Sequence, residues 1–198
     1  MNAVVGVLAL QGAFAKHLKM MQSLGVHCVE VRTAEELNEC DGLIIPGGES
    51  TTMAKLLSKG DLWDPLRQFS SVKPIFGTCA GMILMANEVV GDFDYPSLGL
   101  LDITVRRNAY GRQTESFSSQ IAVDLGKGLV DSFHGIFIRA PRLETWGSKM
   151  DILAKWEEVP VLIRKGLHLG ASFHPELTND PMIHRYFLDI VLERVGVL

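Results

Sequence analysis

The stretch Lys73-Pro74-Ile75-Phe76-Gly77-Thr78-Cys79-Ala80-Gly81-Met82-Ile83-Leu84-Met85-Ala86 decides the fold. It predicts a short apolar strand, a Gly-x-Cys-x-Gly turn and then an apolar helix. The same arrangement with serine is the nucleophile elbow, in which a tight strand-to-helix turn exposes the nucleophile at the carboxyl end of a strand. The flanking glycines permit a cramped backbone, and a helix N-terminus aimed at Cys79 favours the thiolate. The alternative is a small buried cysteine in an ordinary turn, because free cysteine is often a core residue.

Apolar runs alternate with helical patterns on the amino-terminal side of this stretch. The expected strands are Ala3–Leu10, His27–Val31 and Gly42–Ile45, and the expected helices are Phe14–Leu24, Ala34–Glu39, Met53–Ser58 and Leu62–Phe69. This alternation predicts an α/β fold with a mostly parallel central sheet and helices on both faces. Because ligand sites in such sheets lie at the carboxyl ends of strands, we expect Gln11-Gly12, Pro46–Thr52 and Cys79 to gather at one edge.

The pattern changes after Gly91. Short strand-like runs follow at Leu98–Arg106, Gln120–Asp124, Ile136–Arg139, Ile152–Lys155, Val161–Arg164 and Leu167–Phe173. They predict short antiparallel additions to the sheet, or a small flanking layer. An amphipathic helix at about Pro181–Val195 is expected to close the fold. With no repeat or linker in the sequence, residues 1–198 are expected to form a single domain.

Composition excludes several classes of protein. The chain has 198 residues, 47% of them hydrophobic and 21% charged, with a net charge of −4. No basic cluster indicates nucleic-acid binding, no apolar run reaches membrane-spanning length, and the N-terminus lacks the basic region of a secretory signal. The cysteines Cys28, Cys40 and Cys79 suit neither a disulfide framework nor a four-cysteine zinc site. We therefore expect a cytoplasmic protein without a metal or cofactor.

A reactive cysteine needs a base, and the base needs an orienting group. In Ser172–Leu177, His174 is the candidate base. Pro175 favours an extended backbone at His174, and residues two apart on an extended segment face the same side, so Glu176 could orient the imidazole. A surface His-Pro turn with a solvated Glu176 is the alternative. The other histidines are less suitably placed: His17 and His184 in helices, His27 and His168 at strand starts, and His134, the reserve candidate, in a turn.

The loop Pro46-Gly47-Gly48-Glu49-Ser50 offers backbone N–H groups to an oxyanion or a carboxylate. It lacks the Gly-Lys-Ser/Thr ending of a P-loop, and no Gly-x-Gly-x-x-Gly follows the first strand, so nucleotide binding is disfavoured. A capped turn with Ser50 or Thr51 as the N-cap is the simpler alternative, and both can hold together. Guanidinium groups in Arg106–Gln113, or Arg139 at the end of its strand, could bind a carboxylate, although without further context a solvated basic turn is the better explanation of such residues.

Together, these motifs resemble class I (triad) glutamine amidotransferases, whose three-layer fold is flavodoxin-like. More narrowly, the chain is similar to the family of glutaminase subunits of pyridoxal 5′-phosphate synthase. The matching segments are Gly6–Gly12, Gly42–Thr52, Phe76–Ile83, Arg107–Gln113 with Ser116-Phe117, Gly135–Pro141 and Ser172–Leu177. The elbow and His-Pro-Glu identify the superfamily, whereas Arg107–Gln113 and Phe137–Pro141 are particular to this family.

The resemblance implies hydrolysis of L-glutamine to L-glutamate and ammonia through a glutamyl thioester. It makes Cys79 the nucleophile, His174 the general base and acid, and Glu176 the residue that orients His174. The implied oxyanion donors are the N–H groups of Gly48 and Ala80. The implied glutamine-binding residues are Gly48, Glu49, Ser50, Arg107, Ile138 and Arg139.

The resemblance also implies a protein partner. Ammonia would pass to a (β/α)8-barrel synthase subunit that builds the cofactor from a pentose phosphate and a triose phosphate, in a hetero-oligomer with glutaminases around a dodecameric synthase core. Gln11 and Gly12 would lie near the contact that activates the glutaminase. Two alternatives stay open: a glutaminase subunit of another enzyme, such as imidazole glycerol phosphate synthase, and a non-catalytic redox sensor that uses Cys79.

Overall fold

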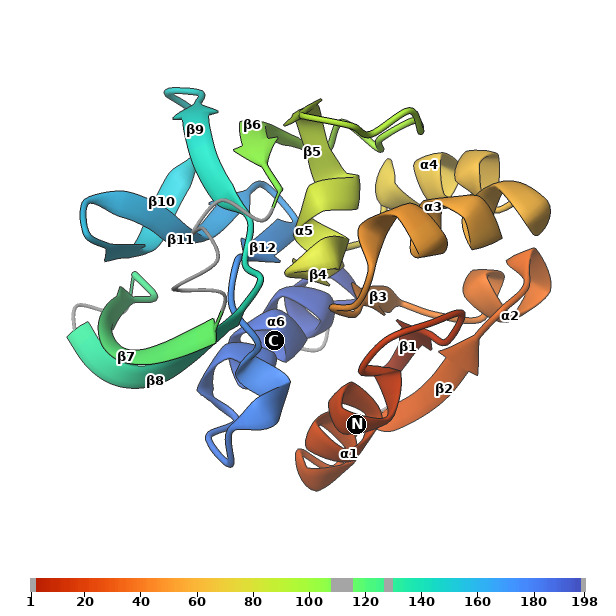
Figure 1. Cartoon of the computed structure of the whole chain (residues 1–198). Coiled ribbons are helices and arrows are strands. Elements are labelled where there is room, and N and C mark those ends of the chain that lie inside the picture. The colour runs from red at the N-terminus through yellow and green to blue at the C-terminus, as the bar shows by residue number, and fades with distance from the viewer. Residues whose placement is uncertain (1–2, 108–115, 127–129, 197–198) are drawn as a thin grey trace.

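A computed structural model describes residues 3–107, 116–126 and 130–196. In this part of the chain, nine strands form a central sheet in the order β2-β1-β3-β4-β12-β11-β10-β7-β8, with helices on either side (Figure 1). A smaller sheet has the order β5-β6-β9. The prediction of an α/β fold with antiparallel additions is confirmed.

One half of the central sheet is parallel. It consists of β2 (His27–Val31), β1 (Val4–Leu8), β3 (Gly42–Ile45), β4 (Ile75–Thr78) and β12 (His168–Ala171). Every residue of β3 and β4 is buried, which explains their continuous apolar sequences. Since β1, β3 and β4 are neighbours and run in the same direction, the loops that follow them meet at one edge, as predicted.

The other half of the central sheet is antiparallel. It comprises β11 (Val159–Lys165), β10 (Asp151–Trp156), β7 (Ser116–Asp124) and β8 (Val130–Ile138). The strands β7 and β8 begin well before the predicted runs Gln120–Asp124 and Ile136–Arg139. No residue is fully buried in their first parts, 116–119 and 130–132, so no apolar run marks them in the sequence. The additions are therefore longer than expected.

The smaller sheet contains two strands that the sequence pattern did not predict. It consists of β5 (Ala86–Val90), β6 (Leu101–Arg106) and β9 (Arg142–Trp146). In β9 only Leu143 is buried, and in β5 only Ala86 is, so neither strand carries a clear alternation of apolar and polar residues.

Helices cover the two faces of the parallel half. The helices are α1 (Phe14–Ser23), α2 (Ala34–Asn38), α3 (Ser50–Lys59), α4 (Trp63–Ser70), α5 (Ala80–Met85) and α6 (Met182–Arg194), with a 3₁₀ turn, η1 (Pro175–Leu177). Side chains of β3 alternate between the two cores: Ile44 belongs to the core of α1 and α6, while Leu43 and Ile45 belong to that of α3, α4 and α5. The central sheet is thus the middle layer of three.

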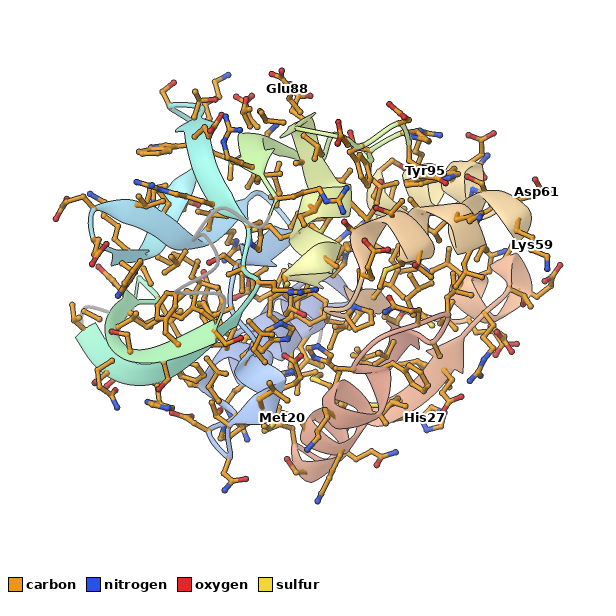
Figure 2. All side chains as sticks on the ribbon, viewed as in Figure 1. Met20, His27, Lys59, Asp61, Glu88 and Tyr95 are labelled. Atoms are coloured by element: carbon orange, nitrogen blue, oxygen red, sulfur yellow. The ribbon has the colours of Figure 1, made fainter. Side chains whose placement is uncertain are left out.

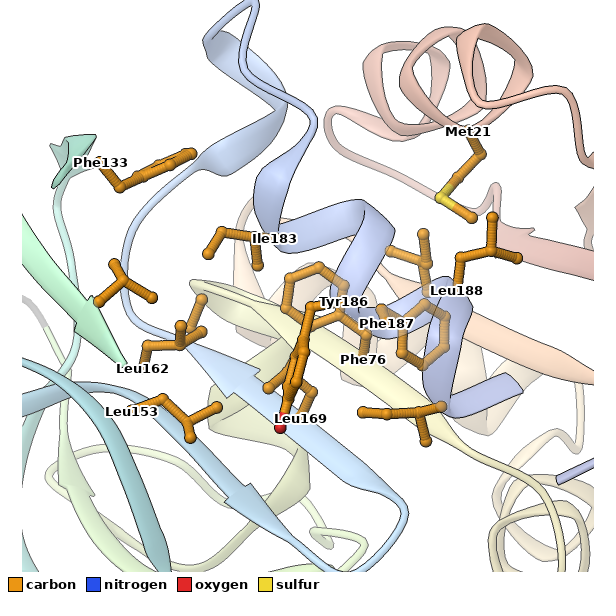
Figure 3. Close-up of a cluster of buried hydrophobic side chains, with 14 of the residues drawn as sticks. Met21, Phe76, Phe133, Leu153, Leu162, Leu169, Ile183, Tyr186, Phe187 and Leu188 are labelled. Carbon is orange, nitrogen blue, oxygen red and sulfur yellow. The ribbon is translucent and has the colours of Figure 1, made fainter. Parts of the chain in front are cut away.

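The core beneath α6 fixes the position of β4 and β12. Phe187 of α6 packs against Phe76 of β4, with ring centroids 5.5 Å apart, and Ile183 and Tyr186 lie over the same region (Figure 3). Charged side chains such as Lys59, Asp61 and Glu88 project outward at the edge of the molecule (Figure 2). No helix in the described ranges has the length and apolar character needed to span a bilayer.

Candidate active site

Cys79 occupies the turn between β4 and α5. Its backbone has φ 48° and ψ −104°, a region that non-glycine residues rarely adopt and that costs about 1–3 kcal/mol. The N–H of Cys79 donates to the carbonyl of Ala171 at 2.8 Å, and its carbonyl accepts from Ile83 at 3.1 Å. A Cβ on Gly81 would collide with the Ile45 carbonyl, so only glycine fits there. The turn is therefore a strained elbow whose neighbours hold the cysteine in place.

His174 and Glu176 follow β12 and lie beside this elbow. Nδ1 of His174 is 2.7 Å from Oε1 of Glu176, and the two side chains are almost fully buried. The backbone N–H of His174 donates to the Ile136 carbonyl at 2.8 Å, which anchors the loop to β8. The expected contact exists, but its geometry differs from the prediction. Glu176 reaches the imidazole because η1 turns the chain with Pro175 as its first residue, not because an extended segment continues.

The surroundings of His174 favour the protonated imidazole. Burial alone would lower the pKa of His174, but hydrogen bonds to Cys79 and Glu176 and the negative charges of both groups outweigh burial and raise it. Nδ1 is committed to Glu176, so Nε2 is the nitrogen available to Cys79. A protonated imidazole beside a cysteine favours the thiolate, which is the nucleophilic form.

The other cysteines lack such a partner. Burial raises the pKa of Cys28 to about 11 and that of Cys40 to about 12. Both therefore stay as thiols near neutral pH, and Cys79 is the cysteine placed to react.

The loop after β3 packs against the loop after β1. Oε1 of Gln11 accepts from the N–H of Glu49 at 3.2 Å, and a Cβ on Gly48 would collide with the Gln11 side chain. The Gly47 carbonyl accepts from the N–H of Ala13 at 3.1 Å. Because the peptide bond between Gly47 and Gly48 is trans, the N–H of Gly48 points opposite to the Gly47 carbonyl and therefore away from Ala13. A Cβ on Gly12, whose φ is +89°, would overlap the Gly47 carbonyl. Both Gly12 and Gly48 therefore need to be glycine.

Glu49 has a role that the sequence pattern did not predict. It is the N-cap of α3, accepting from the N–H groups of Thr51 at 3.1 Å and Thr52 at 2.6 Å, so the prediction of Ser50 or Thr51 as the N-cap is wrong. The helix begins at Ser50 because this carboxylate satisfies its first N–H groups. Burial raises the pKa of Glu49, but hydrogen bonds from Thr52 and Thr51 outweigh it and hold the pKa below its usual range.

Arg107 completes the charged side of the site. Its Nη2 lies 3.2 Å from Oε1 of Glu49, its Nη1 donates to the Asp92 carbonyl at 2.8 Å, and its guanidinium lies over the Phe93 ring. The pair joins a cation to a carboxylate at the rim of the site. The rest of the predicted Arg106–Gln113 run, from residue 108 onward, lies outside the described residues, and Arg106 pairs with Glu144 instead.

These groups surround a cavity of about 380 Å³. It is lined by Gln11, Gly48, Glu49, Ser50, Cys79, Ile83, Arg107, Ile138, Arg139 and His174. Sγ of Cys79 lies 3.7 Å from the Ile138 carbonyl. Arg139 follows β8 with φ 45°. The other residues predicted for the site, Gly12, Ala80 and Glu176, are not among the lining residues.

The structure also places residues that the sequence did not connect with the site. Ile83 lines the cavity from α5, and no motif distinguishes it from other apolar helix residues. His134, the reserve candidate, is exposed on β8 and bonds weakly to Gln120, so its assignment to a turn is wrong. His17 and His184 lie in helices, as predicted, but both are completely buried, and His17 reaches Glu176. Within the described residues, no cluster of histidine, cysteine or acidic side chains could hold a metal ion.

Comparison of the sequence with known proteins finds one glutamine amidotransferase family and relatives that share one name. A family model described as the SNO glutamine amidotransferase family matches residues 7–193. A protein from Anoxybacillus flavithermus named pyridoxal 5′-phosphate synthase subunit PdxT is 49% identical over 190 residues, which cover 96% of this chain and 97% of that protein. A protein of the same name from Thermosipho africanus is 50% identical over 188 residues, covering 94% of this chain and 98% of that protein.

Comparison with solved structures also finds glutamine amidotransferases. A solved structure titled as a crystal structure of glutamine amidotransferase superposes with a TM-score of 0.89 at 48% identity, covering 96% of this chain and 99% of that one. A glutamine amidotransferase from Thermotoga maritima superposes with a TM-score of 0.61 at 14% identity, covering 100% of this chain and 87% of that one, and shares the fold. Because the family model spans most of the sequence and the relatives are about half identical along nearly all of it, the chain belongs to the SNO glutamine amidotransferase family.

Proposed function

We propose that this protein hydrolyses L-glutamine to L-glutamate and ammonia, as the cytoplasmic glutaminase subunit of a pyridoxal 5′-phosphate synthase. The observation that carries the proposal is Cys79 and His174 opening together onto a cavity, with Glu176 bonded to the far side of the imidazole. A nucleophile, a base and an orienting carboxylate in that order form a catalytic triad. The relatives that carry the PdxT name support the pathway.

The first half of the reaction acylates Cys79. Its thiolate attacks the carboxamide carbon, so that a C–S bond forms and the carbonyl electrons move to oxygen. Collapse of this intermediate breaks the C–N bond, and Nε2–H of His174 gives its proton to the departing ammonia. The product is a glutamyl thioester. Glu176 keeps the proton on Nδ1 throughout, which leaves Nε2 to exchange the catalytic proton.

The second half releases glutamate. Neutral His174 takes a proton from water, the resulting hydroxide attacks the thioester carbon, and the C–S bond breaks to regenerate the thiolate. In both halves the developing oxyanion would be held by the N–H groups of Gly48 and Ala80. Ala80 is the first residue of α5, where an N–H has no acceptor within the helix, and Gly48 belongs to the loop beside Cys79.

The rim of the cavity suits the zwitterionic end of glutamine. Arg107 and Arg139 offer positive charge to the α-carboxylate, Glu49 offers negative charge to the ammonium group, and the Ile138 backbone adds polar groups. A volume of about 380 Å³ is sufficient for one amino acid. These charges suit an amino acid, whose side-chain amide would be directed at the buried Cys79.

The ammonia is proposed to pass to a (β/α)8-barrel synthase subunit in a large hetero-oligomer. Gln11 and Gly12 are the proposed contact, since Gln11 bonds to the loop that carries Gly48 and could transmit docking to the oxyanion site. The test is an ammonia-release assay with and without the synthase, using Cys79→Ala as the control. Release from wild-type protein beside the synthase is expected, and an active Cys79→Ala variant would exclude the triad. A redox sensor would instead lose its thiol to peroxide and show no glutamine turnover in the complex.

A further inference from the structure

A row of buried side chains continues from Glu176 away from the cavity. Nε2 of His17 lies 3.4 Å from Oε2 of Glu176 and 3.2 Å from Oγ1 of Thr78. Nδ1 of His17 lies 2.9 Å from Nε2 of His184. His17, Thr78 and His184 are each 0% exposed. The row thus links α6, α1 and the end of β4 to the carboxylate that bonds His174.

The second carboxylate oxygen of Glu176 indicates what this row of side chains does. Oε1 of Glu176 accepts from His174, but the buried Oε2 has no well-directed hydrogen bond among the described residues. The nitrogen of His17 is the polar atom nearest to supplying one, at 3.4 Å. A buried carboxylate oxygen without a donor costs roughly 1–3 kcal/mol or more. A modest movement of His17 or Glu176 would satisfy it.

The donors and acceptors around His17 and His184 determine which ring nitrogen of each imidazole carries the proton. If Nδ1 of His17 carried the proton, its bare Nε2 would face the Oε2 lone pairs, and His184 would have to bury an Nδ1–H that has no partner. If Nε2 of each ring carries the proton instead, His184 donates to Nδ1 of His17, and His17 donates toward Glu176 and Thr78. Nδ1 of His184 is then an unpaired acceptor, which is less costly than a buried unpaired donor. The second arrangement leaves neither imidazole with a buried N–H that lacks a neighbouring acceptor.

Both histidines are neutral at physiological pH. Burial lowers the pKa of His17 to about 4, only partly opposed by the charge of Glu176, and burial also lowers the pKa of His184. The titratable groups that face this pair are Glu176 and His174 from the η1 segment, with Cys79 beyond them at the end of β4. His17 therefore acts on Glu176 through the dipole of its N–H rather than through a full charge.

We propose that His17 is a positioning residue of the triad, held by His184 in the Nε2–H tautomer, so that it orients the Glu176 carboxylate toward Nδ1 of His174. The catalytic meaning of this role rests on the proposed glutaminase function. His17 is not among the residues that line the cavity. Its removal should therefore affect turnover and the titration of His174 rather than glutamine binding.

The direct test is ¹⁵N-detected NMR of the full-length wild-type protein labelled at its histidines. The proposal requires neutral Nε2–H tautomers for both His17 and His184 at pH 7. An Nδ1–H tautomer or an imidazolium at His17 would overturn it. This experiment needs neither a substitution nor the synthase, so it judges the proposal whatever the glutaminase assay gives.

The second test compares two variants. His17→Leu removes both ring nitrogens at similar size, whereas His17→Gln places a carboxamide N–H at the position of Nε2. His17→Leu is expected to lower the pKa of His174, seen by NMR, and to lower kcat roughly 10-fold with KM changed less than about twofold, as expected for loss of an outer-shell partner. His17→Gln should restore most of both. An unchanged His174 pKa in folded His17→Leu would overturn the proposal, and a wild-type complex that releases no ammonia would overturn the proposed function alone.

Discussion

Replacing Gly47 by alanine tests the geometry of the triad without altering any catalytic group. A Cβ at Gly47 would lie 2.8 Å from Nδ1 of His174, closer still to Cε1, and 3.3 Å from Cβ of Cys79. An ordinary contact is 3.4 Å, so the imidazole would have to retreat by more than 0.6 Å. Glu176 holds the same ring at 2.7 Å, so a shift of the imidazole would disturb this hydrogen bond.

A displacement of about 1 Å in a catalytic group costs on the order of 10²-fold in rate, or about 2.7 kcal/mol of transition-state stabilisation. We therefore expect Gly47→Ala to lower kcat for ammonia release in the synthase complex by roughly that factor. Gly60→Ala is the matched control, because a Cβ there meets nothing closer than 3.4 Å and its φ is −93°. Folded Gly47→Ala with wild-type kcat would refute the inference that catalysis needs His174 in its observed position.

Three further predictions concern binding, the orienting carboxylate and pH. Arg107→Ala should raise KM for glutamine roughly 10-fold, as for loss of a charge-assisted contact, while Arg106→Ala, outside the cavity, should leave it unchanged in the same assay. Glu176→Gln should reduce kcat by roughly 10³–10⁴-fold, because an amide permits the wrong imidazole tautomer, and near-normal turnover would exclude the orienting role. In the folded protein the pKa of His17 is lowered from 6.5 to about 4. As pH falls below about 6.5, His17 is therefore protonated in the unfolded chain before it is protonated in the folded one, and the free energy of unfolding decreases. In urea titrations, the wild-type loss between pH 7 and pH 5 should exceed that of His17→Gln by about 2 kcal/mol, and equal losses would contradict the burial of neutral His17.

The elbow and the parallel half of the sheet could be predicted because their signals are local. The apolar sequences of β3 and β4 reflect burial on both faces. The glycines around Cys79 form a short motif at fixed spacing, although the contact that requires Gly81 is with the distant Ile45 carbonyl. The residues after β1, β3 and β4 could be predicted to lie together, because parallel neighbouring strands bring their carboxyl ends to one edge of the sheet.

What could not be predicted depends on contacts between distant segments. The strand β9 buries only Leu143, so its sequence carries no alternation, and it is defined by pairing with β6. His17 looked like an ordinary helix residue because its partners, Glu176 and His184, come from the other end of the chain. Glu49 caps α3 with its own carboxylate, a role that propensity assigns to serine or threonine.

The role of Cys79 as the nucleophile is tested most directly by treating the protein in its synthase complex with a diazoketone analogue of glutamine and mapping the modified peptides by mass spectrometry. We predict one adduct per chain, on Cys79, with Cys28 and Cys40 unmodified because burial keeps both as thiols. Loss of ammonia release should follow the labelling, and excess L-glutamine should protect against it. An adduct on Cys28 or Cys40, or full glutaminase activity in a protein completely labelled at Cys79, would contradict the claim.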